Sequence, residues 1–224
     1  ARDAGFDNIN VDLMSALPGQ SEESWQETLR FVCGLEPEHI SAYSLIVEDG
    51  TPLAQKAASG AVRIPDEDEA ADFYQLGLQE LSRLGYCQYE ISNFARPGEE
   101  CRHNVGYWQG AYYLGLGVSA HSMLPASEEE KSAGAAYVRT ANVSRTEDYC
   151  RMMEETSSAM EARQPISRKE AMFEAMMLGL RMNQGVSGKD FQRRFGSSIR
   201  EIYEAPLNRA VRNGLGQWAA DGGY

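Results

Sequence analysis

Residues 8–25 read NINVDLMSALPGQSEESW, and this stretch decides the fold class. From Ile9 to Met14 apolar residues alternate with polar ones, which is typical of a β-strand. A Pro-Gly pair then predicts a turn. Ser21, followed by two glutamates, predicts the N-cap and first turn of a helix. The stretch therefore predicts a strand, a loop and a helix in succession, with Asp12 on the strand.

Similar patterns recur along the first half of the chain. The sequence predicts further strands at residues 39–47, 86–92 and 112–119. The acidic run at residues 66–69 predicts the start of an amphipathic helix that ends at Gly85. Strands separated by helices or long loops are typical of parallel β/α units, in an open sheet or a barrel. The expected fold class is therefore α/β.

The second half of the chain has a different character. Residues 145–163 and 168–181 are charged, rich in methionine and helical in pattern, and glycines and a proline predict short, broken helices after them. A stretch rich in Ala, Ser, Gly and Glu predicts a boundary near residues 126–139. Three parts are expected: residues 1–125, the α/β part; 126–165, a helical connection; and 166–224, a small helical domain.

Composition narrows the possible functions. The chain has 224 residues, a hydrophobic fraction of 42% and a net charge of −12. This charge argues against a surface that binds nucleic acid, because phosphates would be repelled. The sequence lacks an apolar run long enough to span a bilayer, so we do not expect this protein to be an integral membrane protein. The four cysteines form no CxxC pair, which favours reduced thiols and a cytoplasmic location.

Residues 101–108, CRHNVGYW, hold the densest group of chemically useful side chains. Cys101 and His103 could ligate a metal, but a metal site needs more ligands than these two. His103 could instead be the axial ligand of a flat molecule such as a porphyrin, which Tyr107 and Trp108 would cover. A histidine beside aromatic residues can also be a purely structural, hydrogen-bonded group. The residues leave these alternatives open.

Two further positions lie at expected strand ends, where α/β folds bind ligands. Asp12 could accept hydrogen bonds from a ribose or an ammonium group, or it could cap a loop amide. The stretch YYLGLGVSAHS at residues 112–122 is rich in glycine but lacks the GxGxxG pattern of dinucleotide sites. Its functional interpretation is close approach of the backbone to a ligand, with His121 at the strand end.

Longer stretches carry a resemblance to a known family. They are GFDNINVDLMSALPGQSEESWQETL, PEHISAYSLIVEDGTPL, YEISNFARPGEECRHNVGYWQGAYYLGLGVSAHS and FEAMMLGLRMNQGVSGKDFQRRFG. Together they resemble the HemW family of radical S-adenosylmethionine heme chaperones, long described as oxygen-independent coproporphyrinogen III oxidase-like proteins. The most specific part is HN..YW after EISNFA. The resemblance implies the C-terminal part of a partial (β/α)6 radical SAM barrel, followed by a small, incomplete helical domain of winged-helix type.

The resemblance also implies cofactors and roles. Asp12, Ile46 and His121 would lie at S-adenosylmethionine, and His103, Cys101, Tyr107 and Trp108 at heme, which is the cargo. Membrane-bound respiratory enzymes would be the partners that receive heme. One alternative is an oxygen-independent coproporphyrinogen III dehydrogenase of porphyrin biosynthesis. Another is a structural remnant without activity.

One family feature is absent from this sequence. Family members hold a [4Fe-4S] cluster through a CxxxCxxC loop, and the chain contains no such motif. We therefore expect a chain truncated at both ends, with the cluster only in the full-length protein and no radical activity in this segment.

Overall fold

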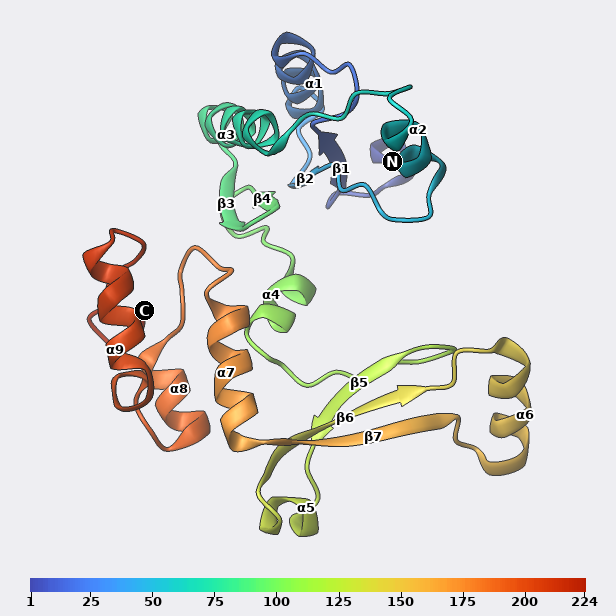
Figure 1. The fold of residues 1–224 in the computed structure, drawn as a ribbon, viewed down its shortest axis with the longest axis vertical. Coiled ribbons are helices and arrows are strands. Elements are labelled where there is room, and N and C mark those ends of the chain that lie inside the picture. Colours follow the sequence, from blue (N-terminus) through green and yellow to red (C-terminus); the bar gives the residue numbers. More distant parts are fainter. The chain divides into compact units, whose positions relative to one another are not determined.

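The computed structural model describes residues 1–224, which form two compact units, unit 1 at residues 1–102 and unit 2 at residues 103–224 (Figure 1). The division precedes the boundary expected near residues 126–139. The reason is strand pairing: β5 (His121–Pro125) pairs with β6 (Ala135–Asn142), so it belongs with the residues that follow it.

Unit 1 is built around a four-stranded sheet of order β1-β2-β4-β3. Strands β1 and β2 are parallel, whereas β4 pairs antiparallel with both β2 and β3. The elements, after a 3-10 helix at Arg2–Ala4, are β1 (Asn10–Ser15), α1 (Glu22–Cys33), β2 (His39–Ser44), α2 (Pro52–Ala58), α3 (Glu67–Arg83), β3 (Cys87–Glu90) and β4 (Asn93–Ala95). The parallel β/α unit is thus confirmed for β1-α1-β2. The strand expected at residues 86–92 is present as β3, but it pairs antiparallel with β4.

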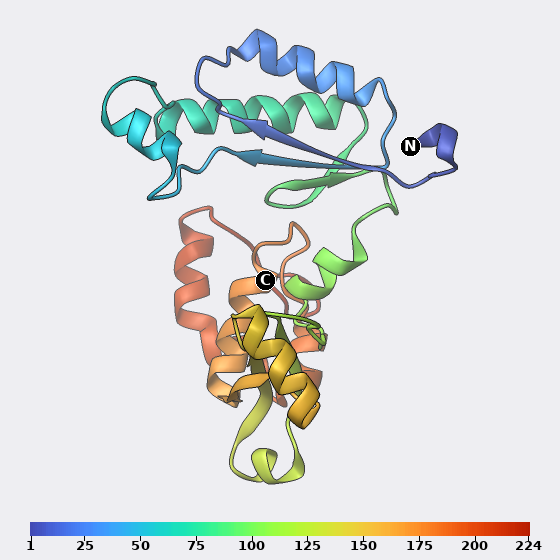
Figure 2. The same ribbon diagram turned by 90° about the vertical axis from the view of Figure 1, so that its right-hand side faces the viewer.

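Helices α1 and α3 lie on the same side of the sheet (Figure 2) and make the core of unit 1 with it. Trp25, Leu29 and Leu81 of these helices are at most 1% exposed, as is Ile40 of β2. Full burial of one such side chain contributes about 1.5–3 kcal/mol. The Trp25 Nε1–H donates to the carbonyl of Phe73 at 3.2 Å, which satisfies its one polar group inside this core.

The ends of these helices follow the sequence pattern. Ser21 caps α1 and Asp66 caps α3, each in a reciprocal capping box with the residue three positions on. Between the two helices, the Glu80 carboxylate accepts hydrogen bonds from Arg30 Nε at 2.7 Å and from Arg83 Nη2 at 2.8 Å. This ion-pair group joins α3 to α1 at the edge of the core.

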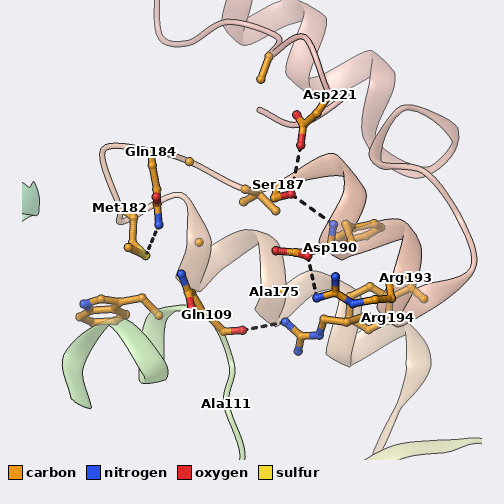
Figure 3. Close-up of a pocket in the computed structure, with 17 residues that line it drawn as sticks. Gln109, Ala111, Ala175, Met182, Gln184, Ser187, Asp190, Arg193, Arg194 and Asp221 are labelled. Carbon is orange, nitrogen blue, oxygen red and sulfur yellow. Dashed lines mark hydrogen bonds and ion pairs between the residues drawn. The ribbon is translucent and has the colours of Figure 1, made fainter. Parts of the chain in front are cut away.

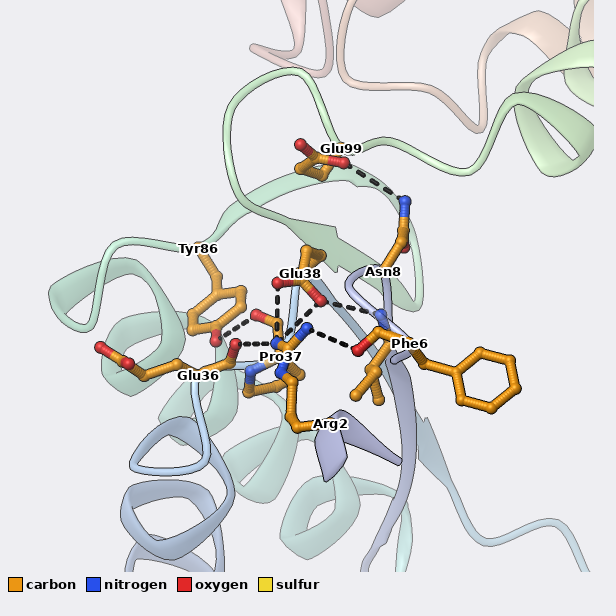
Figure 4. Close-up of polar contacts among 9 residues, drawn as sticks. Arg2, Phe6, Asn8, Glu36, Pro37, Glu38, Tyr86 and Glu99 are labelled. Carbon is orange, nitrogen blue, oxygen red and sulfur yellow. Dashed lines mark hydrogen bonds and ion pairs between the residues drawn. The ribbon is translucent and has the colours of Figure 1, made fainter. Parts of the chain in front are cut away.

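The segment before β1 is fastened to the loop before β2 (Figure 4). Arg2 Nη2 donates to the Glu38 carboxylate at 2.7 Å and to the Glu36 carbonyl at 2.7 Å. The Ile9 N–H donates to the same Glu38 carboxylate at 2.8 Å. Arg2 and the α1–β2 loop therefore fix the entry into the first strand.

Unit 2 contains a three-stranded antiparallel sheet of order β5-β6-β7 and six helices. Its core packs Met123, Tyr137 and Ile166 of the sheet against the helices that follow β7. The elements are α4 (Arg102–Trp108), which begins at the last residue of unit 1, β5 and β6 as given above, α5 (Glu128–Ser132) between them, α6 (Thr146–Thr156), β7 (Met160–Ser167), α7 (Arg168–Gly179), α8 (Gly188–Phe195) and α9 (Ile199–Arg212). No helix in either unit is long and apolar enough to cross a membrane.

Two expectations for this half were wrong. Residues 112–119 form no strand beyond a single bridge from Tyr113 to Met123, because the chain turns back there and Gly117 adopts φ +103°. Residues 126–165 are no purely helical connection, because β6 and most of β7 lie in them. Broken helices are confirmed at Gly196, which ends α8 with φ +63°, whereas α9 continues through Pro206.

Candidate functional site

The face of unit 1's sheet that points away from α1 and α3 is polar. Asn10 and Asp12 of β1 lie in register beside His39 and Ser41 of β2. The intervening residues, such as Ile40, face the helices instead, because side chains alternate along a strand. The sheet therefore presents Asp12 within a row of polar side chains.

These side chains form one hydrogen-bonded network. His39 Nε2 lies 2.9 Å from the Tyr89 hydroxyl, and His39 Nδ1 lies 2.6 Å from Asn10 Oδ1. Since Asn10 Oδ1 can only accept, His39 Nδ1 carries the proton, and Tyr89 donates to the other ring nitrogen. Asn10 Nδ2 then donates to Asp12 Oδ1 at 2.6 Å. Asp12 is thus oriented through its Oδ1 oxygen, while Oδ2 has no partner within the chain.

Burial favours the neutral form of His39 in this hydrogen-bonded network. Loss of hydration lowers the pKa of His39, although the negative charges of Asp12 and Glu90 oppose this effect. A neutral imidazole is also the form that can accept a hydrogen bond from the Tyr89 hydroxyl while it donates one to Asn10.

The polar face continues onto β4 and β3. Asn93 pairs with Ser41 across the sheet, so both side chains lie on the same face. The Asn93 amide donates to the buried Glu90 carboxylate, but Asn93 Oδ1 is buried without a hydrogen-bond partner. An unpaired buried acceptor is costly, so this oxygen is available to a donor from a ligand or water.

The other residues expected at S-adenosylmethionine are not part of this row. Ile46 is in the loop after β2 and is 76% exposed. His121 is exposed at the start of β5 in unit 2. Beyond β1, Ala16 adopts φ +58° while 2% exposed, a left-handed conformation that costs a non-glycine residue about 1–2 kcal/mol. The loop at the end of β1 is therefore held in a strained conformation.

In unit 2, the residues of CRHNVGYW form helix α4 and an aromatic cluster. The ring centroids of His103 and Tyr107 are 4.7 Å apart, and those of Tyr107 and Tyr113 are 4.8 Å apart, both edge-on. The His103 side chain is exposed and makes no hydrogen bond in the structure. The structure therefore gives no support for His103 as a hydrogen-bonded structural residue. Cys101 is half-buried among the last residues of unit 1.

Two cavities adjoin this cluster within unit 2. One, of about 320 Å³, is lined by Tyr107, Tyr113, Met123 and other residues, and Arg139 reaches it. The second, of about 430 Å³, lies between the end of α4 and helices α7 and α8. Trp108 lines both cavities, and its Nε1 is buried without a hydrogen-bond partner.

The structure shows no metal centre. It contains no group of three or more His, Cys, Asp or Glu side chains arranged to hold a metal ion, and all four cysteines are free. The cysteines of this chain therefore do not fit a [4Fe-4S] cluster.

Some of these residues were not expected from the sequence. Asn10, His39 and Ser41 were missed, although polar residues at matching positions of two parallel strands were a usable signal. The unpaired atoms of Asn93 and Trp108 carried no signal, since pairing depends on the neighbours that the fold supplies.

Comparisons with known proteins agree with this architecture. The family model described as HemN C-terminal domain matches residues 166–222. A solved structure, "Coproporphyrinogen III oxidase (HemN) from Escherichia coli is a Radical SAM enzyme", aligns with a TM-score of 0.68 at 21% identity, covering 95% of this chain and 49% of that chain. The fold is thus that of a HemN-type radical SAM protein: part of its α/β barrel, followed by a HemN C-terminal domain.

Curated relatives define the family more narrowly. "Heme chaperone HemW" of Bacillus subtilis is 33% identical over 215 residues, which are 96% of this chain and 54% of that protein. "Heme chaperone HemW" of Mycobacterium tuberculosis is 31% identical, over 97% of this chain and 54% of that protein. A third relative, "Radical S-adenosyl methionine domain-containing protein 1, mitochondrial" of Bos taurus, is 35% identical over 92% of this chain and 49% of its own length. The chain is a homologue of the HemW heme chaperones over nearly its whole length, and it spans about half the length of these relatives.

Proposed function

We propose that this chain is part of a HemW-type heme chaperone, which binds heme through unit 2 and S-adenosylmethionine through unit 1, and delivers heme to membrane-bound respiratory proteins. The observation that carries the proposal is the match to relatives named heme chaperones along 96% of the chain. The exposed His103 beside an aromatic cluster and an apolar cavity supports it, because these are the groups that hold a porphyrin.

His103 is the proposed iron ligand. Its ring has no competing hydrogen bond, and an imidazole nitrogen is a common axial ligand of heme iron. Tyr107 and Trp108 supply aromatic surface for the porphyrin. Cys101, two residues before His103, is the second candidate ligand.

Asp12 is the proposed contact to S-adenosylmethionine. Its Oδ2 oxygen has no partner in the chain, while Oδ1 is held by Asn10, so a carboxylate of fixed orientation can accept from ribose hydroxyls or an ammonium group. The backbone at Ile46, in the loop after β2, would approach the adenine. A [4Fe-4S] cluster is proposed only for a longer protein that carries CxxxCxxC.

Titration with heme tests the first part of the proposal. We expect the chain to bind heme with a Soret band typical of histidine ligation, and His103→Ala to shift or weaken that band with little change in thermal stability. Arg102→Ala, at the neighbouring exposed position of the same helix, is the matched control and should leave the band unaltered. Absence of heme binding would overturn the heme proposal, and an unaltered spectrum in His103→Ala would remove His103 from the site.

The second part can be tested by nuclear magnetic resonance. Addition of S-adenosylmethionine should shift amide signals along β1 and the loop after β2, and Asp12→Asn should weaken this response about tenfold or more, since it removes a charge-assisted hydrogen bond. Asp7→Asn, an exposed carboxylate before β1, serves as the control. Equal responses in the wild type and Asp12→Asn would reject Asp12 as a contact.

A further inference from the structure

The cavity of about 430 Å³ in unit 2 has a polar side and an apolar side (Figure 3). Arg194 extends from α8 toward Gln109, which follows the end of α4, and Asp190 faces Arg193. The apolar lining includes Ala175, Phe191 and Phe195. A concave space that combines apolar lining with a few fixed polar groups is the usual form of a small-molecule site.

Of the four charged side chains that line this cavity, only Asp190 and Arg193 form an ion pair with each other. Asp190 accepts from Arg193 Nη2 at 2.7 Å. Asp221 accepts from the Ser187 hydroxyl and the Gly188 amide, both at 3.1 Å. Neither carboxylate contacts Arg194. The cation of Arg194 therefore has no ion-pair partner in the chain.

Arg194 uses only a small part of its bonding capacity. Its Nη1 donates to the Gln109 carbonyl at 2.8 Å, and its guanidinium lies 5.2 Å from the centre of the Phe195 ring. A guanidinium has five N–H donors, so several remain for another acceptor. Loss of hydration lowers the pKa of Arg194, and the Arg193 charge acts in the same direction, whereas Tyr112 and Asp190 oppose it.

Trp108 supplies a second unused donor on the same cavity. Its indole Nε1–H is buried and has no acceptor in the chain. The Arg181 guanidinium lies 4.9 Å from the centre of the Trp108 ring, which adds a second positive charge close to this side chain. Guanidinium and indole donors at one cavity favour an anionic acceptor that is small and planar, and a carboxylate has this form.

We infer that Arg194 and the Trp108 indole form a carboxylate-binding subsite in this cavity, which selects apolar ligands that carry a carboxylate. The inference rests on the proposed function, in which that carboxylate is a propionate of heme. Arg194 then determines specificity: it distinguishes a porphyrin with free propionates from one whose propionates are neutral esters. Its hydrogen bond to Gln109 holds the guanidinium in place before the ligand arrives.

The test compares two ligands and three variants of the full chain. The ligands are heme and heme dimethyl ester, whose propionates cannot carry charge. The variants are Arg194→Gln; Trp108→Phe, which keeps an aromatic ring but removes the indole donor; and Arg193→Gln, at the adjacent arginine that is already paired with Asp190. Affinity is measured from the Soret band at increasing ligand concentration, and thermal unfolding of each variant is recorded beside it.

We expect Arg194→Gln to weaken heme binding about tenfold to a hundredfold, as for a lost charge-assisted hydrogen bond, and Trp108→Phe to weaken it less. The Arg194 change should not affect the ester, which should bind the wild type and Arg194→Gln alike. Arg193→Gln should bind heme as the wild type does.

Equal losses for heme and ester in Arg194→Gln would overturn the inference and assign Arg194 to holding α4 against α8. Unaltered heme affinity in Arg194→Gln would overturn it as well. Both results leave the proposed function intact, because the wild type still binds heme. If the wild type binds neither porphyrin, the proposed function itself fails.

Discussion

Replacing Glu80 with glutamine should destabilise unit 1, by an amount that depends on pH. The Glu80 side chain is 10% exposed and pairs with Arg30 and Arg83. The hydrogen bonds from Arg83 and then Arg30 lower the pKa of this carboxyl to about 2 from the ordinary 4.5. That difference alone corresponds to about 3 kcal/mol. Both guanidinium groups are more than half exposed, so solvent reduces the expected loss in Glu80→Gln to about 1–2 kcal/mol.

The sign of the pH dependence follows from the lowered pKa. Above about pH 4.5, Glu80 is charged in both the folded and the unfolded chain, and its full contribution to stability is present. As the pH falls from 4.5 toward 2, the unfolded chain takes up the proton first, so this contribution is lost. The stability difference between the wild type and Glu80→Gln should therefore be constant from pH 7 to 5 and shrink below pH 4.5.

Urea unfolding followed by tryptophan fluorescence measures this difference. Trp25 is the tryptophan of unit 1, so Trp108 and Trp218 are replaced by phenylalanine to make the emission report on this unit. Glu27→Gln, an exposed glutamate on α1 without an ion pair, is the control and should change the unfolding free energy by less than about 0.5 kcal/mol. A difference for Glu80→Gln that does not shrink down to pH 3 would refute the reasoning.

Two further predictions concern the sheet of unit 1. Burial lowers the pKa of His39, so the unfolded chain binds the proton first and stability falls as the pH drops below about 6.5. His39→Gln should make this fall smaller. Urea midpoints between pH 7.5 and 5 measure the effect, and an unchanged pH profile would contradict it. Ile40→Ala should cost about 2–5 kcal/mol, since Ile40 is 0% exposed, whereas Ile46→Ala, at a side chain 76% exposed, should cost less than about 0.5 kcal/mol. Equal thermal shifts in these two variants would show that the core assignment is wrong.

The sequence predicted the elements whose signals are local. Ser21 and Asp66 mark the starts of α1 and α3 because an N-cap needs only the residue and the amides three positions on. The alternation from Ile9 to Met14 identified β1 because one face of that strand packs on helices. Asp12 was identified at the same step.

The elements that depend on distant partners were predicted poorly. Residues 112–119 are apolar enough for a strand, yet a Cβ on Gly115 would clash with the His121 carbonyl, so the backbone approaches closely there and turns. Strand β7 is polar and contains Pro165, which is tolerated because β7 is an edge strand paired only with β6. Likewise, nothing local shows that Arg194 lacks a carboxylate partner, since that depends on where Asp190 and Asp221 lie.

The two edges of unit 1's sheet differ in their capacity to accept another strand. At one edge, β3 is four residues long and its register shifts between Gln88 and Glu90, which disfavours pairing with a further strand. At the other, β1 is six residues long, regular, and paired only with β2. Growth of the sheet is therefore directional: an added strand, from the same polypeptide or from a neighbouring molecule, would align with β1 and place its own side chains next to Asn10 and Asp12.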